Sequence, residues 1–299
     1  MSACDRRRFL AGSVACLAAA ALRRSARAEP RGGAAATEPL AVPRALEAEL
    51  GGRIGIMARN TENGATLEWR ADERFAMCST FKWVLAAAIL ARVERGEVSL
   101  EQRIEYDEAD LLDYAPVTRA RVAEGAMPVA DLCHAAVAVS DNTAANLLLP
   151  LVGGPAGLTA FFRQHGDAVS RLDREEPELN SNLPGDERDT TTPRAMLDTM
   201  ERLLLGNALQ PTSRKRLNEW LTESTTGRNR LRAGLPDGWT VGDKTGTGAN
   251  GAANDVAIAW PPGRSPLLIA VYLSGSTAPM ADLNAAHERI ARTVAESLA

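Results

Sequence analysis

The stretch CSTFKWVLAAAILARVERG, residues 78–96, is a long apolar segment that ends in a glycine. Its run of alanine, leucine and isoleucine predicts a buried helix from Ser79 to a stop at Gly96. A hydroxyl at Ser79 and an amine at Lys82 open the segment, although the packing of an apolar helix needs neither. Residues three apart share one face of a helix, so the spacing predicts that these two side chains lie close together.

Lysine is rare in this chain. Only Lys82, Lys215 and Lys244 occur among the 34 basic residues. Arginine keeps its proton, whereas a buried lysine has a lowered pKa and can act as a base or as a compact charge. The Ser-x-x-Lys spacing also fits a helix N-cap serine followed by a lysine that reaches solvent. Further motifs are therefore needed to choose between these interpretations.

Strand patterns lie on both sides of the helical middle of the chain. RIGIMARN (53–60) and ATLEWR (65–70), joined by TENG, predict a hairpin, and residues 239–247, 252–260 and 266–274 predict three more strands. The expected fold class is α/β + α. It has an antiparallel sheet of about five strands, built from both ends of the chain and flanked by helices, with an inserted all-helical domain and the active site between the two.

These patterns set the expected domain boundaries. Residues 43–77 and 223–299 form the sheet domain, and residues 78–222 form the helical domain. Within the helical domain, the polar residues 173–190 form a long loop with few apolar side chains. A loop of this length in a compact chain points to a functional role.

The first 28 residues resemble an export signal. Three arginines at 6–8 precede Phe9, Leu10 and a mildly apolar run that is too short to span a bilayer, and residues 26–28, ARA, offer a cleavage site. We expect a twin-arginine export signal over 1–28, a flexible lead-in over 29–42, and a periplasmic or secreted enzyme. The alternatives are an arginine-rich disordered tail and, less favoured, a lipoprotein signal ending at Cys16.

Charge and composition exclude several classes of protein. Residues 1–28 hold six arginines and one aspartate, so the remainder carries a formal charge of −9, which disfavours nucleic-acid binding. Its three histidines, His134, His165 and His287, form no cluster that would suit zinc. We expect no cofactor, no metal, no nucleic-acid partner, no membrane anchor in the mature form, and a monomer.

Two further tripeptides support a catalytic interpretation of Ser79 and Lys82. Ser140-Asp141-Asn142 lies between two helical patterns, and Lys244-Thr245-Gly246 lies on a strand near the end of the chain. Each tripeptide is expected by chance in roughly one chain in twenty of this length. In this order, together with Ser79-Thr80-Phe81-Lys82, they resemble the motifs of the penicillin-recognising serine enzymes.

The long polar loop indicates which class of penicillin-recognising enzyme the chain resembles. Glu176-Pro177-Glu178-Leu179-Asn180 resembles the omega loop of class A β-lactamases, and Arg174 and Asp189 resemble its salt-bridged ends. The resemblance extends from about residue 44 to the C-terminus. It implies that the chain hydrolyses the amide bond of β-lactam antibiotics through a serine acyl-enzyme, which confers resistance, with the β-lactam as its small-molecule partner.

The resemblance also implies roles for particular residues. Ser79 would be the nucleophile, with the oxyanion held by the backbone N–H groups of Ser79 and Thr247. Lys82 would take the hydroxyl proton, with Glu176 acting through a water, and Ser140 would relay a proton to the leaving nitrogen. Glu176 and Asn180 would position the water that hydrolyses the acyl-enzyme.

The remaining implied roles concern substrate binding. Lys244, Thr245, Gly246 and Thr247 would bind the carboxylate of the antibiotic, and Asn142 would hold its side-chain amide and the Lys82 region. Relatives add an arginine, and Arg230 takes that role because alanines occupy the downstream positions 252 and 253. Tyr114 matches the aromatic residue at the entrance of the cleft.

Two features separate this chain from some relatives. Family disulfides would join Cys78 to position 248 and Cys133 to position 86, where this chain has glycine and alanine. We therefore expect both thiols to be free and buried.

Two rival functions share the three motifs: a D-alanyl-D-alanine carboxypeptidase of the penicillin-binding class, and a β-lactam sensor that stays acylated. Both would lack the Glu176 and Asn180 pair.

Overall fold

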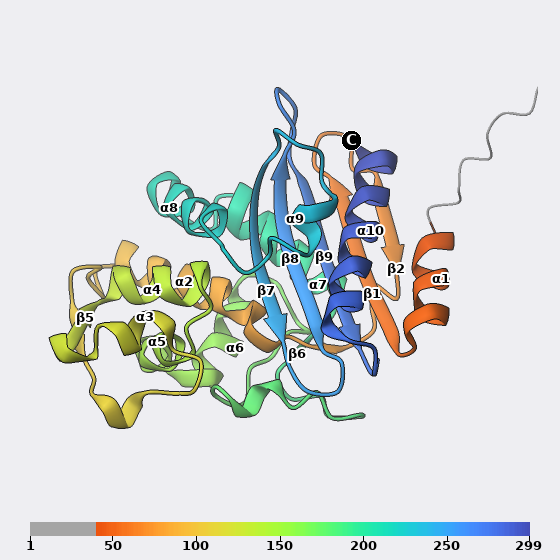
Figure 1. The fold of residues 1–299 in the computed structure, drawn as a ribbon. Coiled ribbons are helices and arrows are strands. Elements are labelled where there is room, and N and C mark those ends of the chain that lie inside the picture. The colour runs from red at the N-terminus through yellow and green to blue at the C-terminus, as the bar shows by residue number, and fades with distance from the viewer. Residues whose placement is uncertain (1–39) are drawn as a thin grey trace, which may run out of the picture. The chain divides into compact units, whose positions relative to one another are not determined.

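The computed structural model describes residues 40–299 (Figure 1). The expected export signal and residues 29–39 of the expected lead-in lie outside the described residues. No helix among the described residues is alone long and apolar enough to cross a bilayer; the bent pair Asn142–Val152 and Gly154–Gln164 passes the same test on length and composition.

A five-stranded antiparallel sheet, made from both ends of the described chain, confirms the predicted fold class. Its order is β2-β1-β9-β8-β7, so the middle strand comes from the C-terminal part. The strands are β1 (Arg53–Asn60), β2 (Thr66–Trp69), β7 (Thr240–Thr247), β8 (Ala253–Trp260) and β9 (Leu267–Ser274). The register pairs Arg53 with Ser274 and Asn60 with Leu267, although more than 200 residues separate the members of each pair along the chain.

Helices from the two ends of the chain cover one face of the sheet. They are α1 (Ala41–Leu50), α9 (Leu231–Gly234) and α10 (Met280–Leu298), and Figure 1 shows α10 running along the sheet beside β1 and β8. Ile56, Val271 and Ile290 belong to the apolar core between these layers. Alternate residues of each strand point to opposite faces, so the same strands supply a second core on the other side.

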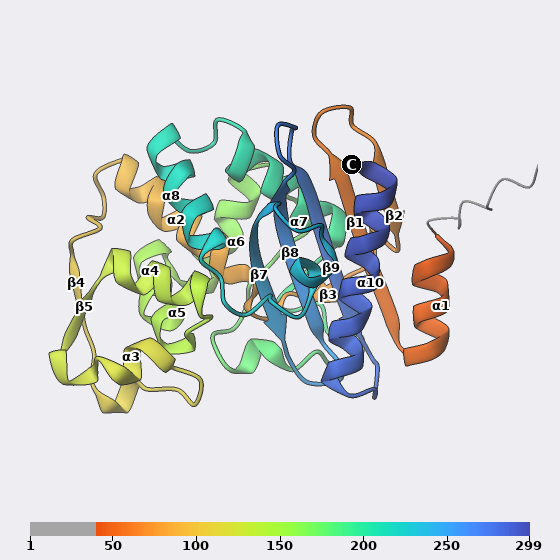
Figure 2. The ribbon, with the colours of Figure 1, turned by 45° about the horizontal axis from the view of Figure 1, so that its top comes forward.

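The other face carries the helical part of the molecule, which Figure 2 shows to one side of the sheet. Its helices are α2 (Phe81–Glu94), α3 (Pro116–Ala120), α4 (Val129–Ala138), α5 (Asn142–Leu148), α6 (Gly154–Gln164), α7 (Pro193–Met200) and α8 (Pro211–Thr222). Short 3-10 turns connect them at Cys78–Thr80, Glu108–Asp110, Val122–Glu124, Leu149–Val152 and Glu178–Asn180. α7 packs on β1 and β9, and α8 packs on β7.

Helix α2 lies at the centre of this second core. All of its residues from Phe81 to Ala91 are buried, which explains why the segment is apolar on every face. The helix begins at Phe81, two residues after the predicted start, because residues 78–80 form a 3-10 turn. Gly96, with φ 72°, follows the end of the helix and takes a left-handed conformation that glycine adopts without strain.

Two small sheets were not predicted. β3 (Phe75–Ala76) pairs with β6 (Thr190–Thr191), and β4 (Arg103–Glu105) pairs with β5 (Ala126–Pro128). Strands of two or three residues are too short to show an alternating pattern. Helix α7 continues directly into a π-helical turn, Glu201–Leu205.

We predict that Gly55→Ala destabilises the fold. A Cβ on Gly55 would lie 2.4 Å from the Phe75 ring and 2.8 Å from Pro193 Cγ, so β1 could no longer approach β3 and α7 as closely. Overpacking of this kind lowers the free energy of unfolding by about 1–3 kcal/mol, measurable by urea titration. The double variant Gly55→Ala/Phe75→Leu should lose less than the sum of its two single variants, and strict additivity would contradict the proposed contact.

Candidate active site

Ser79 lies in a strained turn and its hydroxyl does not cap the helix. Cys78, the residue before it, has a φ of 45°, a left-handed conformation that is costly for a residue with a Cβ. The helix that follows has no side-chain cap. The Ser79 hydroxyl instead donates to Glu176 Oε1 at 2.9 Å, so the N-cap interpretation of this serine is wrong.

Lys82 is completely buried and is surrounded by acceptors. Its Nζ donates to the Ser140 carbonyl at 2.9 Å and to Asn142 Oδ1 at 2.5 Å, and lies 2.9 Å from Glu176 Oε1. Within residues 40–299 it has no hydrogen bond to Ser79; the two side chains meet at the same carboxylate oxygen instead. Burial lowers the pKa of Lys82, and the Glu176 charge only partly opposes this.

Glu176 is an ionised carboxylate inside the protein. Burial alone would raise its pKa, but the Lys82 charge and the hydrogen bonds from Lys82, Asn180 and Ser79 bring the pKa below its ordinary value. Asn180 Nδ2 donates to Glu176 Oε2 at 2.5 Å. Asn146 on α5 holds the backbone of Glu176, because its amide donates to the Glu176 carbonyl and its Oδ1 accepts the Glu176 N–H.

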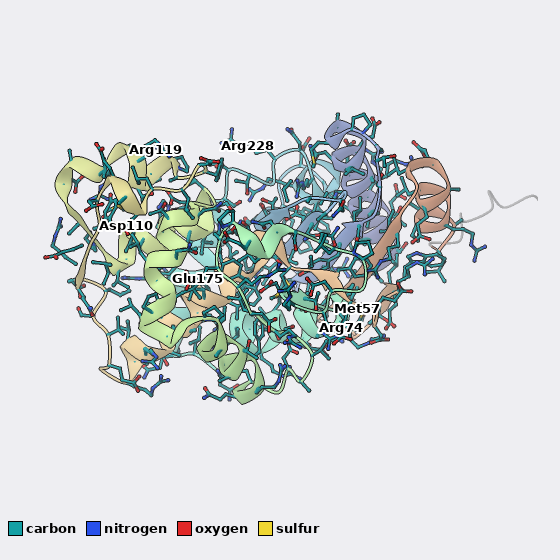
Figure 3. The ribbon with its side chains drawn as sticks, turned by 90° about the horizontal axis from the view of Figure 1, so that it is seen from below. Met57, Arg74, Asp110, Arg119, Glu175 and Arg228 are labelled. Atoms are coloured by element: carbon teal, nitrogen blue, oxygen red, sulfur yellow. The ribbon has the colours of Figure 1, made fainter. Side chains whose placement is uncertain are left out.

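The loop that carries Glu176 is closed at its two ends, as the resemblance implied. Arg174 Nε donates to Asp189 Oδ2 at 2.6 Å, and Asp189 Oδ1 accepts the backbone N–H groups of Asp173 and Arg174. Figure 3 shows Glu175, the neighbour of Glu176, between the labelled residues of the helical part and those of the sheet part. The ion pair confirms the expected salt bridge.

Ser140 connects the two lysines. It has a φ of 64° in the turn between α4 and α5, and this left-handed conformation is strained for serine. Its carbonyl accepts Lys82, and its hydroxyl accepts Lys244 Nζ at 2.9 Å. Burial, followed by the nearby Lys82 charge, lowers the pKa of Lys244 to about 7.

Arg230 supplies a further cation at the end of β7. Its guanidinium donates to the carbonyls of Gly246 and Asn254 at 2.9 and 2.6 Å, to Thr247 Oγ1 at 2.7 Å and to Asn284 Oδ1 at 2.9 Å. None of these partners carries a charge, and burial lowers the pKa of Arg230. Its positive charge is therefore available to an anion in the neighbouring cavity.

One cavity of about 330 Å³ brings these groups together. Its lining consists of Ser79, Tyr114, Ser140, Asn142, Asn180, Thr226, Arg230, Thr245 and Thr247. The other expected site residues, Lys82, Glu176, Lys244 and Gly246, contact this lining from behind. Tyr114 is 51% exposed, as expected of a residue at the entrance of a cleft.

Sequence reasoning missed two residues of this site. Thr226 lines the cavity and accepts a hydrogen bond from Thr245 Oγ1 at 2.7 Å. Asn146 fixes the Glu176 backbone. The signal for Asn146 was an amide in the otherwise apolar helical run AANLLL, whereas Thr226 lies in the polar segment STTGRNR, which has no distinguishing pattern.

The two cysteines of the described chain are free and buried, as expected. Burial raises the pKa of the Cys78 thiol to about 12 and also raises that of Cys133. A Cβ on Gly248 would lie 2.8 Å from Cys78 Sγ, so only a glycine fits beside this thiol without a shift. No group of three or more His, Cys, Asp or Glu side chains in residues 40–299 has the arrangement of a metal site.

The site combines the groups that covalent catalysis needs. A serine hydroxyl donates to an ionised carboxylate, which can accept its proton. Two lysines and a second serine form a connected network. Arg230, Thr245 and Thr247 line the cavity, and Lys244 lies behind them. The arrangement suits attack by Ser79 on a carbonyl of a substrate that carries an anionic group.

Comparisons with known proteins agree with this arrangement. The model of the beta-lactamase enzyme family matches residues 42–298. Beta-lactamase AST-1 of Nocardia asteroides is 47% identical over 98% of this chain and 96% of its own length. Beta-lactamase FAR-1 of Nocardia farcinica is 51% identical over 79% of this chain and 75% of its own length.

Solved structures give the same result. The class A beta-lactamase of the last common ancestor of Gram-negative bacteria is 54% identical, with a TM-score of 0.85 over 87% of this chain and 98% of its own. Sequence and fold therefore agree over nearly all the described residues. The chain belongs to the beta-lactamase enzyme family and is a class A serine β-lactamase.

Proposed function

We propose that this enzyme hydrolyses the amide bond of β-lactam antibiotics through an acyl-enzyme on Ser79, and so confers resistance to them. The observation that carries the proposal is the shared acceptor: Ser79 Oγ and Lys82 Nζ both lie 2.9 Å from Glu176 Oε1. An ionised carboxylate at hydrogen-bond distance can take the serine proton as the hydroxyl attacks.

The first half-reaction forms the ester and opens the lactam ring. The Ser79 oxygen bonds to the lactam carbonyl carbon, the ring C–N bond breaks, and the Ser79 proton passes to Glu176. The Ser140 hydroxyl gives its proton to the departing nitrogen and regains one from Lys82, whose Nζ lies 3.5 Å from Ser140 Oγ. Lys82 in turn takes the proton from Glu176, at 2.9 Å, so the carboxylate is again free to act as a base. The backbone N–H groups of Ser79 and Thr247 hold the oxyanion.

The residues at the end of β7, together with Arg230, bind the carboxylate of the substrate. Lys244, Thr245, Thr247 and Arg230 present two positive charges and two hydroxyls to the carboxylate of the antibiotic. The Gly246 carbonyl accepts Arg230 and so fixes the guanidinium. The oxygen of the Asn142 amide accepts Lys82, so its nitrogen can donate to the side-chain amide of the substrate.

The second half-reaction, hydrolysis of the acyl-enzyme, distinguishes a β-lactamase from the carboxypeptidase and the sensor. Asn180 Oδ1 is buried and accepts no hydrogen bond within the described chain, so it can accept one from a water. The same side chain donates to Glu176. A water held between these two groups can lose a proton to the carboxylate and attack the ester carbonyl. The bond from the acyl carbon to Ser79 Oγ then breaks, and Glu176 returns the proton to that oxygen. The resemblance implies that a carboxypeptidase or a sensor would lack this pair.

Glu176→Gln should trap the acyl-enzyme. The amide keeps the shape of the carboxylate but is not a base, and loss of general-base catalysis slows the second half-reaction by about 10²–10⁴-fold. The first half-reaction continues, because without the Glu176 charge the pKa of Lys82 falls further and its neutral amine can take the Ser79 proton. Intact-protein mass spectrometry after mixing with benzylpenicillin should show the adduct persisting on the variant, while wild type returns to its free mass.

Glu178→Gln is the matched control, since Glu178 is an exposed carboxylate on the same loop, and it should turn over like wild type. Ser79→Ala should show no adduct. A long-lived adduct on wild type would instead indicate a penicillin-binding protein or a sensor, and no adduct or turnover on any variant would exclude the whole group of functions.

Lys244 gives the reaction an alkaline limit. Its pKa of about 7 means that the ammonium which binds the substrate carboxylate loses its proton as the pH rises through 7. Because kcat/KM reports ionisations of the free enzyme, it should fall above that pH. In Lys244→Arg the guanidinium stays charged, so the fall should move to higher pH. The same alkaline limb in both proteins would show that another group controls it.

We also propose that the enzyme is exported by the twin-arginine route, cleaved after Ala28 and active as a periplasmic or secreted monomer. The RRRFL sequence at 6–10 supports this. Replacement of Arg6 and Arg7 by lysine should retain the precursor in the cytoplasm. Cell fractionation and N-terminal sequencing test the route, and light scattering tests the monomer. Export of the lysine variant at the normal level would contradict the route.

A further inference from the structure

Two asparagines join the loop that carries Glu176 to the turn between β7 and β8. Asn182 Nδ2 donates to the carbonyls of Ala249 and Asn250 at 3.3 and 3.0 Å. Asn250 Nδ2 donates in return to the carbonyls of Ser181 and Asn182 at 3.0 and 3.3 Å. We call Asn182 and Asn250 the asparagine clasp, because each amide binds the backbone of the other segment.

Both residues of the clasp have left-handed backbones. The φ of Asn182 is 44° and that of Asn250 is 50°. Asparagine tolerates this conformation better than most residues with a Cβ, and glycine adopts it without strain. The two positions therefore suit asparagine for its amide and for its backbone, and replacement by glycine removes the amide without adding strain.

The clasp is anchored to the centre of the sheet. Ser274 Oγ, at the end of β9, donates to Asn182 Oδ1 at 3.1 Å, which leaves the Asn182 nitrogen facing the turn. The Asn250 carbonyl accepts the Gly275 N–H at 2.8 Å. Because β9 is the middle strand of five and is hydrogen-bonded on both sides, the clasp ties the loop to the centre of the sheet.

Next to the clasp lies the pair assigned to deacylation. The Asn180 carbonyl accepts the Ala249 N–H at 2.9 Å, while the Asn180 side chain donates to Glu176 Oε2 at 2.5 Å. A Cβ on Gly248 would lie 2.5 Å from the Asn180 carbonyl oxygen, so the loop and the end of β7 are in tight contact. A shift of the loop away from this turn would move Asn180 relative to Glu176.

We propose that Asn182 and Asn250 are positioning residues for deacylation, a role that rests on the function proposed above for Glu176 and Asn180. Neither amide lines the cavity that Ser79 faces. Most groups used in acylation are held by other elements: Ser79 by the turn before α2, Ser140 by the turn between α4 and α5, and Lys244 by β7. Glu176 serves both half-reactions, but Asn146 on α5 holds its backbone, whereas Asn180 serves only the second half-reaction and lies next to the clasp. Loss of the clasp should therefore slow the second half-reaction and leave the first unchanged.

This division gives a kinetic signature. In a two-step acyl-enzyme reaction kcat/KM contains only substrate binding and acylation, whereas slower deacylation lowers kcat and KM together. Asn182→Gly and Asn250→Gly should each lower the deacylation rate constant about tenfold, since small displacements of positioned groups cost up to about a hundredfold. The acylation rate constant and kcat/KM should stay at the wild-type values.

The experiment measures both rate constants with benzylpenicillin, by stopped-flow absorbance for acylation and by decay of the adduct in quenched mass spectra for deacylation. The double variant Asn182→Gly/Asn250→Gly should resemble the single variants, because the two amides act as one unit. Asn250→Asp should be slower than Asn250→Gly, since a carboxylate would face the carbonyls of Ser181 and Asn182.

Asn63→Gly is the matched control. Within residues 40–299, the Asn63 side chain accepts a hydrogen bond only from the Ala65 N–H, in the β1–β2 turn. This variant should have wild-type kinetics. Unchanged deacylation in both clasp variants would overturn the proposal, and so would an equal fall of both rate constants, which would indicate a general structural role. If wild type forms no adduct and hydrolyses nothing, the proposed function fails first and the clasp loses its role with it.

Discussion

The buried ion pair between Lys82 and Glu176 is the interaction on which the rest of the site depends. Both side chains have no exposure to solvent. Removing one partner of such a pair costs about 3–5 kcal/mol, because the other charge is left buried and alone. The protein holds the pair with further groups: Asn142 and the Ser140 carbonyl for the ammonium, and Asn180 for the carboxylate.

The ion pair also joins two parts of the fold that lie far apart in the sequence. Lys82 comes from the buried helix α2, and Glu176 comes from a loop that the Arg174–Asp189 bridge closes at its base. Two of the residues that surround the pair, Cys78 and Ser140, have left-handed backbones although neither is glycine. Strain at both positions is sustained by dense packing around α2, which is a common relation between a core and a catalytic site.

Much of the fold and of the site could be predicted from the sequence, because the strand patterns and the catalytic motifs are short continuous stretches of the chain. The five strands had clear patterns, and the motifs at 79–82, 140–142, 176–180 and 244–246 carried the site residues into one cavity and its immediate surroundings.

Other features depended on tertiary contacts that no local pattern encodes. The spacing of Ser79 and Lys82 predicted direct proximity, whereas in the fold both bind the same oxygen of Glu176, 97 residues away from Ser79. The pairing of Asn182 with Asn250 was invisible for the same reason, since 68 residues separate them.

The strand order has a consequence for folding of the nascent chain on the ribosome. β9, the middle strand of the sheet, is the last strand to be synthesised, and its partner β1 is the first. Until residues 267–274 have emerged, β1 and β8 each lack a neighbour, and the apolar faces that should meet β9 stay uncovered. Contacts of such long sequence separation form slowly. The nascent chain is therefore at greatest risk of aggregation just before its synthesis ends.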